Sequence, residues 1–484
     1  MKINEQLQKT NSDVNMASRI LTESFHKMNR HCDGAESLKF ILLVLVHKQI
    51  YDDKLYKNIS FGDMEYVLEF SPVEYKRNSE NIEDYVNNYL NQLSRIGVIL
   101  NCIDRENFSF EEVISDQEQG FILKNEEVKS IFCEIVKKVY NMPRFQRGIV
   151  FHAVLEDMMS HFFDYPCKAN ELTPNRYIAQ LMDNLLNANN NDVILDGAIG
   201  TGFTVGLGAK LKPMYGYEEM LYYGSKIYGI DHNRYYCQIA ALYLVLTGHR
   251  FKVSQADFIQ FADKNEQRFD KISMEIPVGL KVQDMLDFDF YNKKKWLDVD
   301  NVVELEWLYV LSAFRLLSEK GRAVLLVPEM VLHRNVKMGV ALRKHLIESH
   351  CISKIISVYY GRREKYALIV LEKNSESIFM VDTISNKDIF YLNSAKSYSM
   401  SQEGLEQLIN ILGSEKEKEN LSAKVPYPQI IEYIYELSPK KYIQKQESVQ
   451  QESMENLSKR LLAYHERLGV LKKEMEELPL FKIN

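Results

Sequence analysis

The sequence predicts an α/β fold with a mostly parallel, doubly wound sheet, and two observations support this. Short β-rich runs alternate with amphipathic helical stretches, the pattern of a sheet whose parallel strands are joined by helices. A glycine-containing loop, residues 196–202, also joins one of these runs to a helix. The predicted strands are residues 192–195, 226–230, 269–273, 322–327, 355–358 and 366–371.

Composition and charge are those of a soluble globular protein. The chain has 484 residues, 46% hydrophobic and 26% charged, which is enough for about two to four domains. Its net charge of -7 gives no overall attraction to nucleic acid, so DNA contact needs a local basic face or a basic partner. The six cysteines lie far apart without metal-ligand spacing, which indicates reduced core residues and no metal site. The longest apolar run near the start, residues 40–46, is far shorter than the ~20 residues of a bilayer span, so we expect a cytoplasmic protein without a membrane segment.

Three segments are expected along the chain. Helical periodicity predicts a helical N-terminal domain over residues 1–143, and residues 144–440 carry the α/β pattern, which weakens past Glu372. Residues 441–484 predict a long C-terminal helix, which ends at Pro479. Its apolar residues alternate steps of three and four: Met454, Leu457, Leu461, Tyr464, Leu468, Leu471, Met475 and Leu478. This helix either packs on its own domain or, slightly favoured by the regular alternation, forms a coiled coil with a partner.

The loop after the first of these strands predicts a cofactor site. Asp196 follows the strand, and Gly200 and Gly202 allow backbone amides to approach a ligand closely. Nicotinamide-binding loops place a third glycine three residues after the second, whereas the next glycine here is Gly206. The strand-end acid and this spacing favour the methyl donor S-adenosylmethionine over NAD.

Four more residues extend the predicted cofactor site. Asp231 follows the next strand, where it can accept from both ribose hydroxyls, and Asp257 is placed to accept from the adenine amino group. Thr173 and Pro174 suit the N-cap and first position of a helix, from which we expect contact with the amino-acid end of the cofactor. Any one of these acids is easily explained as a solvated turn residue, but three acids at consecutive strand ends form a coherent site.

These motifs resemble the modification subunit of type I restriction-modification systems, a family of N6-adenine DNA methyltransferases. Residues 196–202 match the family's D-P-A-C-G-S-G loop, and residues 171–174 are similar to its F-Y-T-P. Residues 321–328 and 331–334 are similar to its G-R-A-x-x-V-L-P and V-L-F-R. The resemblance implies a Rossmann-like methyltransferase domain that uses S-adenosylmethionine. It also implies helical end segments that pack against DNA, a specificity subunit and other modification subunits.

The catalytic motif departs from that of the family. The family has N-P-P-[FY], in which the Asn and a Pro carbonyl accept from the adenine amino group and the aromatic ring stacks on the flipped base. This chain has Glu275, Ile276, Pro277 and Val278, followed by the family's glycine at Gly279. A carboxylate can accept from an amino group, and some relatives carry Asp, but Glu is one methylene longer. The valine removes a stacking platform worth about 1–3 kcal/mol.

The leading hypothesis is a methylase-like subunit that keeps the cofactor fold, with methyl transfer weakened or lost, and acts in DNA binding or assembly. One alternative is an active N6-adenine DNA methyltransferase in which Glu275 takes the Asn role and Tyr359 or Tyr360 provides the stacking face. A second is methylation of a protein or small molecule, since this cofactor loop serves many acceptors. A third is a structural protein without cofactor, because Gly197 and Ile199 depart from the family loop.

Overall fold

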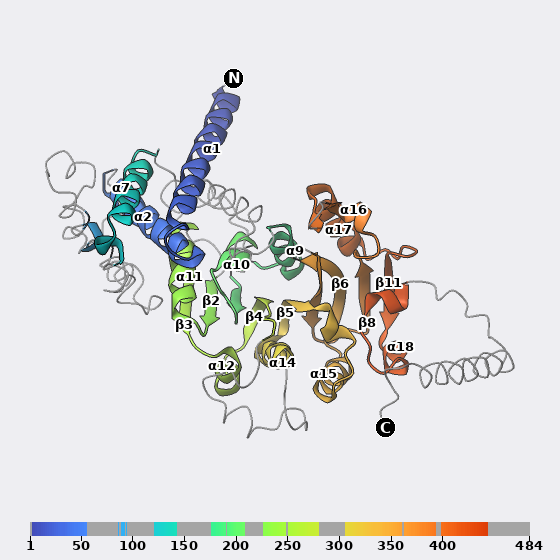
Figure 1. The fold of residues 1–484 in the computed structure, drawn as a ribbon. Coiled ribbons are helices and arrows are strands. Elements are labelled where there is room, and N and C mark those ends of the chain that lie inside the picture. The colour runs from blue at the N-terminus through green and yellow to red at the C-terminus, as the bar shows by residue number, and fades with distance from the viewer. Residues whose placement is uncertain are drawn as a thin grey trace, which may run out of the picture.

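A nine-stranded sheet with helices on both faces forms the body of the protein (Figure 1). The computed structural model describes residues 2–55, 86, 89–91, 93, 121–142, 176–189, 191–208, 226–247, 250–279, 305–360, 363–393 and 398–443. Thr173, Pro174 and the predicted seam between Met454 and Leu478 lie outside the described residues.

The sheet has the strand order β11-β8-β6-β7-β5-β4-β1-β2-β3. Its strands are β1 Val193–Asp196, β2 Lys226–Asp231, β3 Arg250–Gln255, β4 Phe269–Glu275, β5 Leu317–Pro328, β6 Ile352–Tyr360, β7 Glu364–Glu372, β8 Ser377–Asp382 and β11 Ser422–Pro426. The pairs β1-β2, β1-β4, β2-β3, β4-β5 and β6-β8 are parallel, whereas β7 is antiparallel to both its neighbours and β11 is antiparallel to β8. The predicted, mostly parallel α/β sheet is confirmed.

The six predicted strands correspond to β1, β2, β4, β5, β6 and β7. The stretch past Glu372, where the sequence pattern weakens, nevertheless holds β8, β11 and a two-stranded sheet of β9 Tyr391–Asn393 and β10 Tyr398–Met400. The apolar residues 378–381 of β8 are all buried, because both faces of this strand are covered. Strands of this kind lack the polar and apolar alternation by which a strand is recognised in a sequence.

Helices cover the two faces of the sheet and form two separate cores (Figure 1). On one face lie α9 Arg176–Leu186, α10 Phe203–Gly208, α11 Arg234–Thr247, α16 Lys387–Phe390 and α17 Gln402–Ser414. On the other lie α12 Phe258–Lys264, α14 Glu306–Leu316, the 3-10 helix η4 Glu329–Leu332, α15 Lys337–Glu348, α18 Tyr427–Glu432 and α19 Pro439–Ile443. Strand β5 shows why both faces must be apolar: Val324 and Leu326 enter the first core, and Ala323, Leu325 and Val327 the second.

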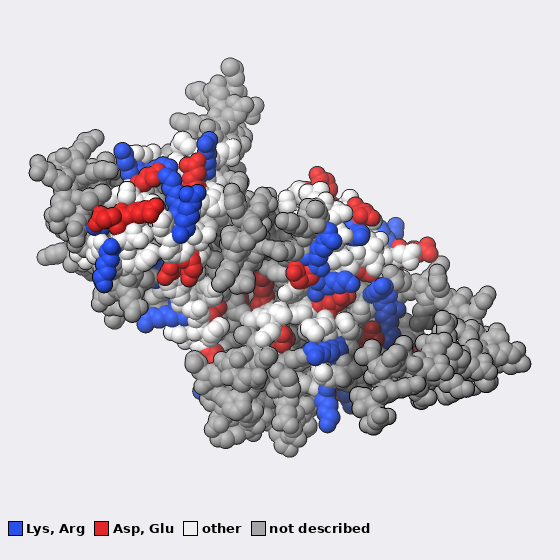
Figure 2. Space-filling view, viewed as in Figure 1, with Lys and Arg blue, Asp and Glu red and all other residues white. Residues whose placement is uncertain are grey.

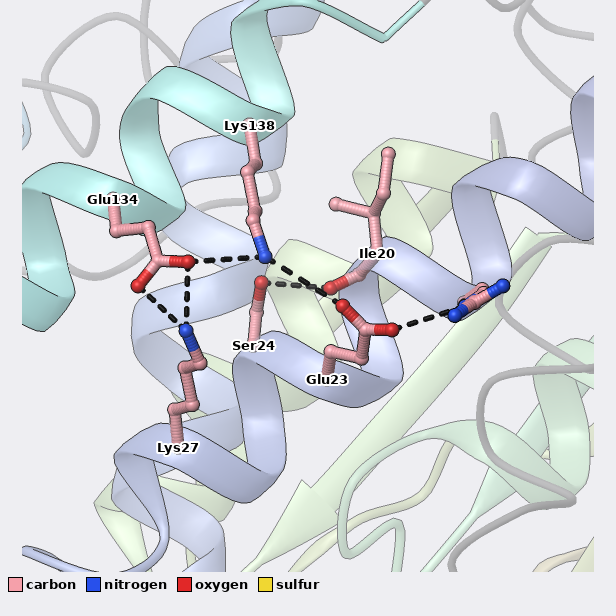
Figure 3. A network of polar contacts seen from close by, with 7 residues as sticks. Ile20, Glu23, Ser24, Lys27, Glu134 and Lys138 are labelled. Carbon is pink, nitrogen blue, oxygen red and sulfur yellow. Dashed lines mark hydrogen bonds and ion pairs between the residues drawn. The ribbon is translucent and has the colours of Figure 1, made fainter.

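The N-terminal helices are α1 Lys2–Met28, α2 Gly34–Leu55 and α7 Glu126–Tyr140. Helix α2 packs against α11, so its apolar residues join the core on that side of the sheet. Two ion pairs connect α1 to α7 (Figure 3): Lys27 Nζ lies 2.6 Å from Glu134 Oε2, and Lys138 Nζ lies 3.5 Å from Glu23 Oε2. Within α7, Lys138 Nζ also lies 3.0 Å from Glu134 Oε1. These pairs are partly exposed and fix the helix pairing with little net stabilisation. The division into domains at residues 143 and 440 stays a prediction.

None of the described helices is a candidate bilayer span. Even α2, with seven consecutive apolar residues, is not apolar over a long enough stretch, and no other described helix qualifies.

Candidate functional site

The carboxyl ends of the parallel strands bring three predicted site residues to one edge of the sheet. Asp196 ends β1, Asp231 ends β2 and Glu275 ends β4, and β1 lies between the other two strands. Because Ile194 pairs with Lys271, the alternation of side chains puts Asp196 and Glu275 on the same face of the sheet. Open α/β sheets bind ligands at this edge, where the strand order reverses.

The loop between β1 and α10 has a backbone that requires its glycines. Gly200 and Gly202 have φ angles of +53° and +81°, in the left-handed region that favours glycine. A Cβ added to Gly202 would lie 3.1 Å from the Cβ of Ala240, so this part of the loop also packs closely on α11. The Gly200 N–H donates to Asp231 Oδ2 at 3.0 Å and thereby ties the loop to the end of β2.

Two departures from the family's loop sequence have packing partners elsewhere in the fold. Gly197 lies against the Phe258 ring, and a Cβ at this position would come within 2.4 Å of the ring. Ile199 fills the space over Gly229, where an added Cβ would lie 2.2 Å from Ile199 Cδ1. A close-packed interior accepts a changed side chain only where its neighbours change too. The loop therefore keeps a defined conformation without the family's proline and cysteine.

The Asp196 carboxyl is buried beneath this loop. Asp196 is only 2% exposed, and its Oδ1 accepts from the Ala198 N–H at 3.0 Å. Burial raises the pKa of Asp196 to about 8, and the nearby Glu275 and Asp231 carboxylates act in the same direction. This carboxyl therefore keeps its proton to a higher pH than an exposed aspartate does.

Asp231 is bound by the backbone through both of its oxygens. Oδ1 accepts from the Asn233 N–H at 2.8 Å, and Oδ2 accepts from the Gly200 N–H. His232 Nδ1 lies 3.4 Å from Oδ1, while burial raises the pKa of the carboxyl. A carboxylate has about four lone-pair sites, so Asp231 keeps the capacity to accept from a ribose hydroxyl.

Asp257 is the N-cap of α12. Its Oδ1 accepts from the Ile259 and Gln260 N–H groups at 2.9 Å and 3.0 Å, which is the usual role of an aspartate at this position. The predicted contact with an adenine amino group stays a prediction for this residue.

Tyr309 on α14 belongs to the same edge, although the sequence patterns did not indicate it. Its ring packs against Phe258, with the ring centroids 5.5 Å apart and the planes at 31°. Burial raises the pKa of its hydroxyl, and Asp257 and Asp231 are near enough to add to the effect. The only signal in the sequence was a tyrosine within a largely apolar helix.

The Glu275 carboxylate is held on both sides by hydroxyl groups. Thr204 Oγ1 donates to Oε1 at 2.6 Å, and the Tyr360 hydroxyl donates to Oε2 at 2.5 Å. Thr204 lies in α10, two residues after Gly202, whereas Tyr360 ends β6. Burial raises the pKa of Glu275, and the two hydrogen bonds oppose that effect. Thr204 is a further residue of the site that the sequence did not indicate.

The rest of the altered tetrapeptide forms the start of the loop after β4. Pro277 is partly buried, while Val278 is 49% exposed. Gly279 has a φ of +76°, and its N–H donates to Glu306 Oε1 at 2.9 Å. Glu306 begins α14 and is only 7% exposed, so a buried carboxylate anchors this loop.

The two tyrosines considered as a stacking face differ in their environments. Tyr359 is 9% exposed and packs on Tyr398, with ring centroids 4.6 Å apart, so it is a core residue rather than a platform for a base. Tyr360 directs its hydroxyl to Glu275, and its ring meets that of Tyr366 edge to face at 5.2 Å. Of these two tyrosines, Tyr360 is the one that contacts Glu275, the last residue of β4.

The comparisons with known proteins agree with this fold. The type I restriction enzyme MpnII methylase subunit of Mycoplasma pneumoniae is 25% identical over 142 residues, which are 28% of this chain and 25% of that protein. The match thus spans about a quarter of this curated relative. A type I restriction-modification methyltransferase subunit from Streptococcus thermophilus has the same fold, with a TM-score of 0.65 at 14% identity, over 88% of this chain and 98% of that one. A chain from a structure of the type I R-M system gives a TM-score of 0.61, also at 14% identity, over 96% and 98% of the two chains.

The family model described as N-6 DNA Methylase matches residues 150–451, more than half of the chain and including every strand of the large sheet. The resemblance to type I modification subunits that the motifs suggested is confirmed, and this chain belongs to the N-6 DNA methylase family.

Proposed function

We propose that the chain is the methylase-like subunit of a type I restriction-modification assembly, with methyl transfer weakened or lost. In this role it keeps the S-adenosylmethionine-binding fold of N6-adenine DNA methyltransferases and serves in DNA binding or assembly. The proposal rests mainly on Glu275, which replaces the family's Asn and whose two carboxylate oxygens accept hydrogen bonds from the Thr204 and Tyr360 hydroxyls.

Two features of the loop after β4 weigh against transfer to adenine. Each Glu275 oxygen already accepts from a hydroxyl group that fixes its orientation, so an acceptor amino group must use the remaining lone pairs in that orientation or displace a charge-assisted hydrogen bond, which costs about 1.5–3 kcal/mol. Val278 is half-exposed where the family has an aromatic ring, so a flipped base finds no stacking platform there. Together these losses slow methyl transfer by several orders of magnitude.

The cofactor itself fits the residues present. Gly200 and Gly202, both in the left-handed region, have no side chains that would block a ligand from the loop backbone. Asp231, which is hydrogen-bonded to the Gly200 N–H, has lone pairs left to accept from a ribose hydroxyl. In this proposal Asp231 holds the ribose and Asp257 the adenine, with Asp196 below the loop and Thr173 and Pro174 at the amino-acid end. S-adenosylmethionine supplies an activated methyl group on a sulfonium.

DNA and partner subunits complete the proposed assembly. Figure 2 shows lysines and arginines interspersed with acidic side chains over the described part of this face, without a broad basic area. With a net charge of -7, the chain is expected to depend on a basic partner for much of its DNA affinity. The proposed partners are a specificity-type or other coiled-coil subunit and a second methylase-like subunit, and the predicted helix of residues 441–484 is the segment proposed to bind them.

Whole-genome mapping of adenine methylation, with and without the gene, tests the proposal. We expect no site-specific N6-methyladenine that disappears on deletion. The triple variant Glu275→Asn, Ile276→Pro, Val278→Tyr restores the family motif and should create such a mark in the same host. A mark that already depends on the unaltered gene would refute the loss of transfer and favour an active enzyme. That alternative has one observation behind it, the position of the Glu275 carboxylate at the end of β4.

A further inference from the structure

Glu275 is the third acid at an edge of the sheet where two neighbouring strands also end in acids. Asp196 and Asp231 end the neighbouring strands, and Glu275 lies on the same face as Asp196. After burial, the nearby Glu275 and Asp231 carboxylates also raise the pKa of Asp196. In the described part of the chain, neither Asp196 nor Glu275 forms an ion pair with a lysine or arginine. An ionised Glu275 would therefore be paired most favourably by a ligand that brings positive charge.

Two neutral hydroxyls aim the Glu275 carboxylate without neutralising it. Thr204 donates to Oε1 at 2.6 Å, and it lies in the helix that begins directly after Gly202 of the cofactor loop. Tyr360 donates to Oε2 at 2.5 Å from the other side. A hydroxyl donor orients a carboxylate but leaves its charge in place. The charge is thus fixed between the cofactor loop and the end of β6.

We propose that Glu275 acts on the cofactor, where its carboxylate, aimed by Thr204 and Tyr360, favours the charged sulfonium of S-adenosylmethionine over the neutral thioether of S-adenosylhomocysteine. This inference rests on the proposed cofactor site. Glu275 ends β4, directly beside β1 and the proposed cofactor loop, and Thr204, two residues after Gly202 of that loop, donates to it, so its carboxylate borders the proposed cofactor site. Only the methylated cofactor carries a positive charge there, so only its binding gains from the nearby carboxylate.

The test is calorimetric titration of the full-length chain with S-adenosylmethionine and, separately, with S-adenosylhomocysteine. We expect the unaltered chain to bind the first about ten-fold more tightly or better, the effect of one partly buried charge pair. Glu275→Gln keeps the size and one acceptor oxygen and should lose most of this ratio, through weaker binding of the methylated cofactor. Glu319→Gln removes an exposed carboxylate near the opposite end of β5 and should leave the ratio unchanged.

The outcomes separate this inference from the proposed function. If neither ligand binds the unaltered chain, the cofactor site itself is refuted. If both bind and Glu275→Gln has the same ratio as the unaltered chain, the charge selection is wrong while the cofactor site stands. Should Glu275→Gln not fold, Thr204→Val and Tyr360→Phe release the carboxylate from its position and should each lower the ratio by roughly three-fold. An unchanged ratio in both of these variants overturns the inference.

Discussion

The free energy of unfolding of the unaltered chain should fall as the pH rises from weakly acidic to alkaline values. Replacing Asp196 by Asn should abolish this part of the pH dependence. The carboxyl is 2% exposed, and burial raises its pKa to about 8, against about 3.9 in an unfolded chain. The folded state therefore binds a proton that the unfolded state releases. This contribution to stability is complete below about pH 4 and is lost as the pH rises through 8.

The size of the effect follows from the same values. One pKa unit corresponds to about 1.4 kcal/mol, so from pH 5 to pH 8 the unaltered chain should lose about 4 kcal/mol relative to Asp196→Asn. The Asn side chain matches the protonated carboxyl in shape and can still accept from the Ala198 N–H, so the two proteins should be nearly equal in stability below about pH 4 and differ by about 1.5 kcal/mol at pH 5.

Urea denaturation of both proteins at pH 5 and pH 8, followed by circular dichroism, measures this difference. Asp270→Asn is the matched control, because Asp270 is an exposed carboxyl on β4 whose loss should not change the pH dependence. An equal free-energy difference between Asp196→Asn and the unaltered chain at the two pH values would refute the argument from burial.

Three further substitutions test the packing of the site. Gly197→Pro restores the family's residue but places atoms against the Phe258 ring, so it should lower the free energy of unfolding by about 1–3 kcal/mol, and Phe258→Leu should recover part of that loss in urea melts of the double variant. Gly202→Ala introduces a Cβ at a φ of +81° and should cost at least about 1 kcal/mol in thermal melts, together with most of the calorimetric signal for cofactor binding. Glu306→Ala removes the acceptor of the Gly279 N–H and should cost about 1–3 kcal/mol; full stability would show that this anchor is dispensable.

The sequence by itself determined the class of fold and the identity of the altered position. Alternating strands and helices predicted the parallel sheet, because crossover connections need helices between parallel strands. The glycine loop and the acids after each strand were visible for the same reason: parallel strands bring their carboxyl ends to one edge. The replacement of the family's Asn by Glu275 was also plain without a structure.

The tertiary structure alone decided what these residues contact. Thr204 and Tyr360 are 71 and 85 residues from Glu275 in the sequence, and only the packing of α10 and β6 on the sheet brings their hydroxyls to its carboxylate. The partners of Gly197 and Ile199 were hidden in the same way, because steric fit between distant segments leaves no periodic signal. A sequence pattern records the face on which a side chain lies, whereas its hydrogen-bond partners depend on the register and packing of the whole sheet.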